Sequence, residues 1–185
     1  METWSKRCHM LPPNVHVCST FDYASTLQSA DRILAEGAQG FSLGLNERFY
    51  PFCTSRDCTP TRLLAEMGIP WYMLKDVIGT YRTYPIRVGG NSGPCYSDQT
   101  ELDWADLRVK PERTTVTNRE RRIFTFSQRQ TDDARMACGP TKAFLNFANY
   151  CRTPDEVEYI LDLIGRDIVQ WVGYGPNVQD VRRLH

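Results

Sequence analysis

Residues 153–176, TPDEVEYILDLIGRDIVQWVGYGP, decide the fold, because they carry a well-marked helix and the strand that follows it. Thr153 is a good N-cap, Pro154 suits the first helical position, and Glu156 completes a capping box. One apolar stripe follows at helical spacing, formed by Val157, Ile160, Leu161 and Ile164. The sequence therefore predicts a helix over 153–165 and a short buried strand over Val169–Val172.

The same alternation of helices and strands extends toward the N-terminus. Thr59-Pro60 opens a helix that stops at Gly68. The other expected elements are helices over 22–32 and Asp132–Cys138, and strands near Val15–Val17 and over Ile33–Glu36, Asp76–Tyr84 and Ala143–Tyr150. This order predicts one α/β domain over 1–185 with a largely parallel sheet and an irregular arm at 1–20. Functional residues are then expected in the loops at the carboxyl ends of the strands.

Composition excludes several classes of protein. The 185 residues carry 22 Lys and Arg against 22 Asp and Glu, and this neutral balance argues against broad DNA or RNA binding. No apolar run approaches the roughly 20 residues that span a bilayer, and no secretory h-region is present. The seven cysteines include no C-x-x-C pair, which favours free thiols in a reducing compartment over a metal site. We therefore expect a cytoplasmic protein without membrane contact.

Four polar loops follow expected strands. EGAQG (36–40) carries Gln39, whose amide can donate to and accept from a heterocycle edge, although a polar turn explains it equally well. YPFCTS (50–55) precedes a helix and could attract an anion or simply cap that helix. TVTNRERR (115–122) crowds three arginines that suit carboxylates or phosphates, unless it is a solvated basic turn. GYGPN (173–177) is a tight turn that could press backbone against a flat base.

Together the four loops resemble the C-terminal half of adenylosuccinate synthetases. Those enzymes join aspartate to the 6-position of inosine monophosphate with GTP and magnesium. The matching stretches are ILAEGAQG (33–40), YPFCTS (50–55), DVIGTYRTYPIRVG (76–89), TVTNRERR (115–122), FLNFAN (144–149) and GYGPN (173–177). The resemblance implies an α/β fold related to the P-loop NTPases, with a mostly parallel sheet and flanking helices, in a truncated form.

The resemblance assigns substrate-binding roles to individual residues. Gln39, Thr54 and Arg119 match family residues that contact the nucleoside monophosphate. Thr115 and Thr117 fall in the loop that binds aspartate, where Asn118 replaces a glycine of the family. Arg119 and Arg121 match the arginines of that loop, and Arg121 would hold the aspartate carboxylate.

The base of the nucleoside triphosphate would be read by Asn149, Gly175 and Pro176. Asn149 replaces the family's aspartate, which accepts from both donors of guanine, and Phe147 replaces a lysine. Because an amide offers guanine only one acceptor and can face adenine's N1 with its own donor, this exchange favours ATP or dATP over GTP, unless the triphosphate site is unused.

The family's GDEGKG phosphate loop, with its catalytic base and magnesium ligand, has no counterpart in these residues. No catalytic residue is therefore assigned. Mg²⁺ is implied by the resemblance, but its ligands are not found in the chain.

The leading hypothesis is a ligase that joins aspartate to a purine nucleoside monophosphate (IMP or dGMP), in a homo-oligomer or with a second polypeptide that carries the phosphate loop. Phage members of the family that act on dGMP suggest a phage origin. Two alternatives stay open: a ligase acting on another, modified nucleotide, and an inactive binding module.

Overall fold

The computed structural model describes residues 12, 14, 15 and 17–185. The chain divides into two compact units, Met1–Glu36 and Gly37–His185. The described part of the first unit contains one helix, α2 (Thr20–Ser29). Ser19 caps this helix: its hydroxyl accepts from the Asp22 N–H, and the Asp22 carboxylate accepts from the Ser19 N–H. The expectation of one domain over 1–185 stays a prediction.

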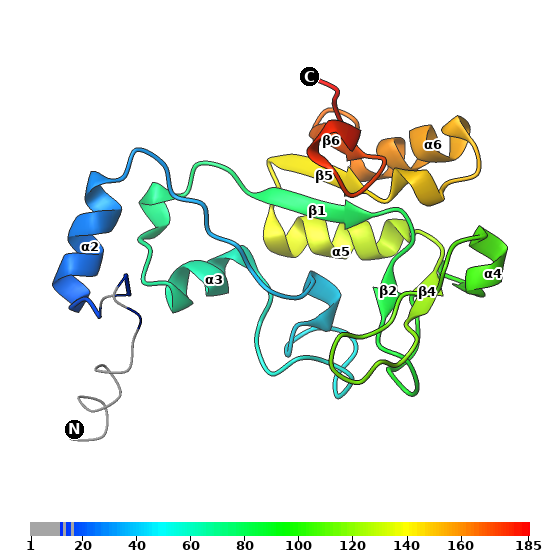
Figure 1. Ribbon diagram of the computed structural model, residues 1–185, viewed down its shortest axis with the longest axis horizontal. Helices are drawn as coiled ribbons and strands as arrows, with labels where there is room; N and C mark the ends of the chain where they lie inside the picture. The colour runs from blue at the N-terminus through cyan, green and yellow to red at the C-terminus, as the bar shows by residue number, and fades with distance from the viewer. Residues whose placement is uncertain (1–11, 13, 16) are drawn as a thin grey trace. The chain divides into compact units, whose positions relative to one another are not determined.

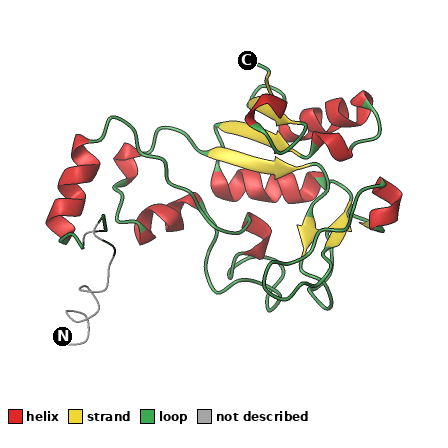
Figure 2. Ribbon diagram, viewed as in Figure 1, coloured by secondary structure: helices red, strands yellow, loops and turns green. Residues whose placement is uncertain are grey.

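The second unit is built on a four-stranded sheet of order β1-β5-β6-β7 (Figures 1 and 2). Its strands are β1 (Ile78–Arg82), β5 (Lys142–Asn146), β6 (Val169–Gly173) and β7 (Val181–Arg183). β1, β5 and β6 run parallel, and only β7 is antiparallel. The predicted α/β fold with a mostly parallel sheet and flanking helices is confirmed.

Helix α6 (Pro154–Ile164) forms the main core with β5 and β6. Its predicted apolar stripe is buried in full, and Ile164 is completely inaccessible to solvent. Leu145 of β5 and Val169 of β6 are the matching buried residues of the sheet. Thr153 caps the helix by accepting from the Glu156 N–H, as the sequence predicts, but the predicted capping box is not formed, because the Glu156 carboxylate accepts from the Arg152 N–H. Burial of each such aliphatic side chain stabilises the fold by about 1.5–3 kcal/mol.

A second sheet, which the sequence analysis did not predict, is antiparallel and has the order β2-β4-β3. Its strands are short: β2 (Ile86–Arg87), β3 (Glu101–Leu102) and β4 (Arg122–Phe124). A smaller core lies beside it, where Trp104 of helix α4 (Trp104–Leu107) packs with Tyr84 and Ile123. The remaining elements are helices α3 (Pro60–Glu66) and α5 (Gln128–Cys138) and the 3₁₀ turns η1 (Phe41–Leu43), η2 (Trp71–Met73), η3 (Ala148–Tyr150) and η4 (Val178–Asp180).

Several predicted elements require correction. No strand covers Ile33–Glu36, because these residues have no neighbouring strand with which to form a hydrogen-bond ladder. Val15 and Val17 are not in a strand either, and His16 lies outside the described residues. The helix expected over 22–32 runs from Thr20 to Ser29, after the Ser19 cap, and the one expected at Asp132–Cys138 starts at Gln128, after the Ser127 cap. Most of the arm predicted at 1–20 lies outside the described residues.

Candidate functional site

One cavity lies at the carboxyl ends of the parallel strands. Its volume is about 470 Å³, and it is lined by Asn146, Phe147, Asn149, Tyr150, Gly175 and Pro176. β5 ends at Asn146 and β6 ends at Gly173, so both strands deliver their following loops to this place. The three residues expected to read the triphosphate base, Asn149, Gly175 and Pro176, are thus brought together from segments 26 residues apart in sequence. We call it the base cavity.

Aromatic rings and one arginine form a wall of the base cavity. Phe147 has a left-handed backbone (φ 63°), and its ring centroid lies 5.2 Å from that of Tyr150. The guanidinium carbon of Arg82, the last residue of β1, lies 3.5 Å from the Phe147 ring centroid. Thr83, which is fully buried, donates from its hydroxyl to the Phe147 carbonyl. These contacts hold the ring in place, so Phe147 is fixed where a flat base could lie against the cavity wall.

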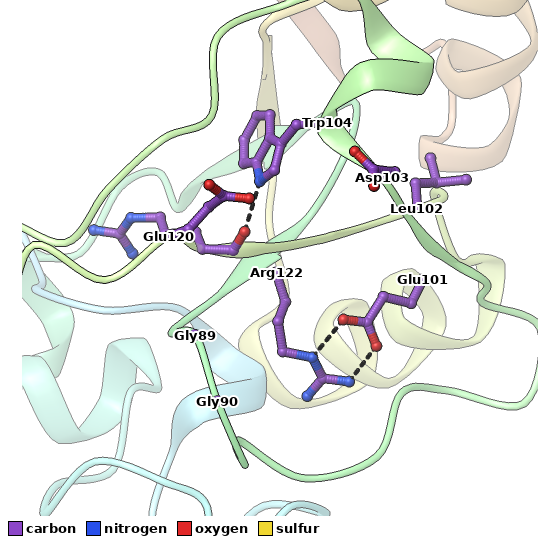
Figure 3. A pocket seen from close by; sticks show the side chains of 9 residues that line it. Gly89, Gly90, Glu101, Leu102, Asp103, Trp104, Glu120 and Arg122 are labelled. Carbon is purple, nitrogen blue, oxygen red and sulfur yellow. Dashed lines mark hydrogen bonds and ion pairs between the residues drawn. The ribbon is translucent and has the colours of Figure 1, made fainter.

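A second cavity, of about 190 Å³, opens beside the small antiparallel sheet (Figure 3). Its lining comes from the loop after β2, from β3 and α4, and from the segment that leads into β4: Gly89, Gly90, Glu101, Leu102, Asp103, Trp104, Glu120, Arg121 and Arg122. A Cβ atom at Gly89 would collide with the carbonyl oxygen of Glu120, so the close approach of these segments requires glycine. We call it the arginine cavity.

The predicted aspartate loop is a compact turn. The Thr114 N–H donates to the Arg119 carbonyl (2.9 Å), and the Arg119 N–H donates to the Thr114 hydroxyl (3.0 Å). Thr117 shares a 2.6 Å hydrogen bond with the Thr114 hydroxyl, and Thr115 is exposed. Asn118 has a φ of 51°, a left-handed conformation that Gly and Asn adopt most easily. Asn118 therefore accommodates the left-handed backbone of the turn.

The three arginines of this segment differ in their partners. Arg122 donates to both carboxylate oxygens of Glu101, at 2.7 and 2.5 Å, and also to Ser92 and Gly93 (Figure 3). This pairing holds the pKa of Glu101 below its usual value. Among the described residues, no side chain or carbonyl pairs with the guanidinium of Arg119 or of Arg121. Arg122 is therefore structural, and the other two arginines remain available to an anionic ligand.

The backbone of Arg121 is fixed on both sides. Its N–H donates to the Glu112 carbonyl at 2.8 Å, and its carbonyl accepts from the Trp104 indole at 2.6 Å. The side chain lies half-buried in the lining of the arginine cavity. Because the main chain is anchored and the guanidinium has no partner among the described residues, Arg121 offers a free planar donor for a carboxylate.

Two of the three predicted monophosphate residues, Gln39 and Thr54, lie on loops that are joined to each other. The Thr54 N–H donates to the carbonyl of Leu43 in η1, the turn that begins two residues after Gln39. Gln39 itself is exposed and has a left-handed backbone (φ 71°). Arg87 connects the Thr54 loop to the loop after β2, because its guanidinium donates to the carbonyls of Phe52 and Pro94. The contacts thus link the loops of Gln39 and Thr54 to the arginine cavity; the roles of the two side chains stay predictions.

Sequence reasoning missed several residues that shape these cavities. No local sequence pattern marks Glu112, Trp104 or Tyr150, because each makes its contacts with residues far away in sequence. No group of three or more His, Cys, Asp or Glu side chains in the described part of the chain could hold a metal ion. No helix among the described residues is long and apolar enough to cross a membrane.

The family model for adenylosuccinate synthetase matches residues 3–179. The chain belongs to the adenylosuccinate synthetase family. This finding confirms the resemblance drawn from the loop motifs.

Phage enzymes are prominent among the similar members of the family. The N6-succino-2-amino-2'-deoxyadenylate synthase of Vibrio phage phiVC8 is 49% identical over 173 residues, which cover 90% of this chain and 50% of that protein. The synthase of the same name from Acinetobacter phage SH-Ab 15497 is 46% identical over 179 residues, covering 90% of this chain and 46% of that protein. The chain thus spans about half the length of these curated relatives.

A solved phage structure agrees with the fold in detail. The succinoaminodeoxyadenylate synthetase of cyanophage S-2L, bound to dGMP and to dATP as an energy donor, superposes with a TM-score of 0.84 at 43% identity. The match covers 90% of this chain and 50% of that one. Adenylosuccinate synthetase from Plasmodium falciparum superposes with a TM-score of 0.74 at 18% identity, over 89% of this chain and 53% of that one, which shows the shared fold.

Proposed function

We propose that this chain acts as a ligase, or as one half of a split ligase, of the adenylosuccinate synthetase family that joins aspartate to dGMP, with ATP or dATP as the energy donor. The observation that carries the proposal is its 46–49% identity, over 90% of its length, to phage synthases whose name describes a succinylated 2-aminodeoxyadenylate. The cyanophage S-2L relative was solved with dGMP and dATP, so both nucleotides are known ligands of a protein 43% identical to this chain.

The geometry of the two cavities supports a different ligand for each. The base cavity is lined by aromatic rings and by amides, which suits a neutral heterocycle. The arginine cavity offers the unpaired guanidinium of Arg121, which suits a carboxylate of aspartate. Arg119, Gln39 and Thr54 are proposed to bind the nucleoside monophosphate, with Thr115 and Thr117 contributing to the aspartate loop. Mg²⁺ would be bound, when present, with the triphosphate and not by a cluster of the described side chains.

Selection of the triphosphate is proposed to rest on Asn149. An aspartate in this place would accept from two donors of guanine, whereas the amide of Asn149 can donate to the adenine N1. A buried donor left without an acceptor costs about 1–3 kcal/mol, enough to reverse a preference between bases. The base cavity is therefore proposed to favour ATP or dATP over GTP.

A product assay tests the proposal. The chain is incubated with dGMP, ¹⁵N-labelled aspartate, dATP and Mg²⁺, and the nucleotides are analysed by mass spectrometry. The expected product is a succinylated nucleotide that carries the ¹⁵N label, and IMP in place of dGMP measures selectivity. Failure to form a labelled product from either monophosphate, at saturating concentrations of folded protein and all substrates, would contradict ligase activity of this chain by itself.

A further inference from the structure

A chain of contacts joins the two cavities, and Glu112 is at its centre. The Glu112 carbonyl accepts from the Arg121 N–H at 2.8 Å, which ties this residue to the arginine cavity. The Glu112 carboxylate makes its contacts with residues at the base cavity: its Oε1 accepts from the Tyr150 hydroxyl at 3.1 Å and from Arg82 Nη2. Tyr150 lines the base cavity. One residue therefore contacts the main chain of one candidate site and a wall of the other.

The contacts on the side of the base cavity are closely packed. Arg82 is only 16% exposed and Glu112 26%, so their ion pair is shielded from water on most sides. The Arg82 guanidinium also lies over Phe147 and donates from Nε to the Tyr84 carbonyl at 2.8 Å. A ligand that shifts or fixes the Phe147 and Tyr150 rings must therefore act on the Arg82–Glu112 pair as well.

The contacts on the side of the arginine cavity connect Glu112 to the turn. Glu112 directly precedes the strand-like bridge between Arg113 and Glu120, which closes the turn that carries Arg119. A change at Glu112 thus reaches both ends of this turn through the backbone, since Arg121 is bonded to its carbonyl. The side chains of Arg119 and Arg121 have no partners of their own within the described chain, so their placement depends on this backbone.

We propose that Glu112 is a positioning residue that couples occupancy of the base cavity to the conformation of the carboxylate-binding turn, residues 112–121. A nucleoside triphosphate whose base contacts Phe147 and Tyr150 then stabilises the turn in the arrangement that binds aspartate. By linkage, aspartate strengthens binding of the triphosphate by the same factor. The inference rests on the proposed function, because it assumes that the base cavity takes the triphosphate base.

Hydrogen exchange of the backbone amides in 112–121, measured by mass spectrometry with and without saturating dATP, tests the coupling. Calorimetry on the same samples establishes whether dATP binds. In the parent chain, dATP should slow exchange in this segment at least about fivefold, the lower end of typical coupling between sites. Tyr150→Phe keeps the ring in the base cavity and removes only the hydroxyl that donates to Glu112. The dATP effect should then weaken without vanishing, because the contacts of Arg82 with Phe147 and with Glu112 remain, while dATP still binds.

Two further variants separate coupling from folding. Glu112→Gln removes the ion pair with Arg82 but keeps the backbone carbonyl that holds Arg121, and should lose the dATP effect. Glu66→Gln is the matched control, because Glu66 is 30% exposed and pairs with Arg56 and Arg62, outside both cavity linings. It should keep the full effect.

The outcomes distinguish the inference from the function on which it rests. If dATP binds the parent chain without slowing exchange in 112–121, or if Glu112→Gln retains the full effect, the coupling is wrong and the proposed function stands. If dATP does not bind the folded parent chain, the proposed role of the base cavity is refuted, and the inference falls with it.

Discussion

Substitution of Arg121 by lysine tests the carboxylate site most sharply. The variant keeps the positive charge but loses the planar pair of donors that grips a carboxylate with two hydrogen bonds. The backbone of residue 121 should stay in place, because its bonds to the Glu112 carbonyl and the Trp104 indole do not involve the side chain. Loss of one charge-assisted hydrogen bond costs about 1.5–3 kcal/mol. The dissociation constant for aspartate should therefore rise about 10- to 150-fold.

Calorimetric titration of aspartate into the chain saturated with dGMP measures this effect. Arg166→Lys is the control. Arg166 is an exposed residue just after α6 that pairs with Glu158 and Asp162 of that helix, and it lies outside both cavity linings. It should bind aspartate like the parent, and thermal melts should show that both variants are folded. If Arg121→Lys binds aspartate as tightly as the parent, Arg121 is surface charge and the reasoning about its unpaired guanidinium is refuted.

Three further predictions concern base selection, acid stability and thiol chemistry. Asn149→Asp should shift the base cavity toward GTP; competition between GTP and dATP measures this, and a parent that already selects GTP would show that Asn149 does not read the base. The pKa of Glu101 is lowered by its hydrogen bonds to Arg122, so this pair stabilises the fold above the usual carboxyl pKa of 4.5, and the contribution is lost as the pH falls below it. Acid unfolding of Glu101→Gln should therefore depend less steeply on pH than that of the parent, whereas equal slopes would contradict the assignment. Burial raises the pKa of the Cys151 thiol to about 12, so iodoacetamide at pH 8 should label it far more slowly than the exposed Cys18, as peptide mass spectrometry can show; equal rates would contradict this burial.

The parts of the fold that the sequence predicted are those specified by local signals. α6 has a cap, a proline at its first position and an apolar stripe within 12 residues, and its predicted place agrees with the structure. The antiparallel sheet was not predicted, because β2, β3 and β4 have only two or three residues each. Such short strands show no recognisable alternation of apolar and polar residues. The strand predicted over Ile33–Glu36 was wrong because a local apolar run was present but its partner was not. Such a run becomes a strand only when a neighbouring strand forms hydrogen bonds with it.

The candidate site likewise contains residues that the sequence predicts and residues that only the folded structure reveals. Its loop residues were found from motifs, because their spacing along the chain resembles that of the family, and the structure groups Asn149 with Pro176 in one cavity. Partners that come from elsewhere in the sequence could not be found. The role of Arg122 is decided by Glu101, 21 residues earlier, and the contact of Tyr150 with Glu112 spans 38 residues. Such pairs become visible only when the chain is folded.

Binding of dGMP is the measurement that tests the central claim most directly, namely that this chain forms the site of a purine nucleoside monophosphate. dGMP, IMP and AMP are each titrated into the folded chain by calorimetry, and the titrations are repeated with Gln39→Ala and Arg119→Ala. The account predicts saturable binding of dGMP at one site, weakened in both variants, by about 2- to 12-fold for the loss of a single neutral hydrogen bond at Gln39. Absence of binding heat with all three nucleotides, or dGMP binding that neither variant weakens, would contradict it.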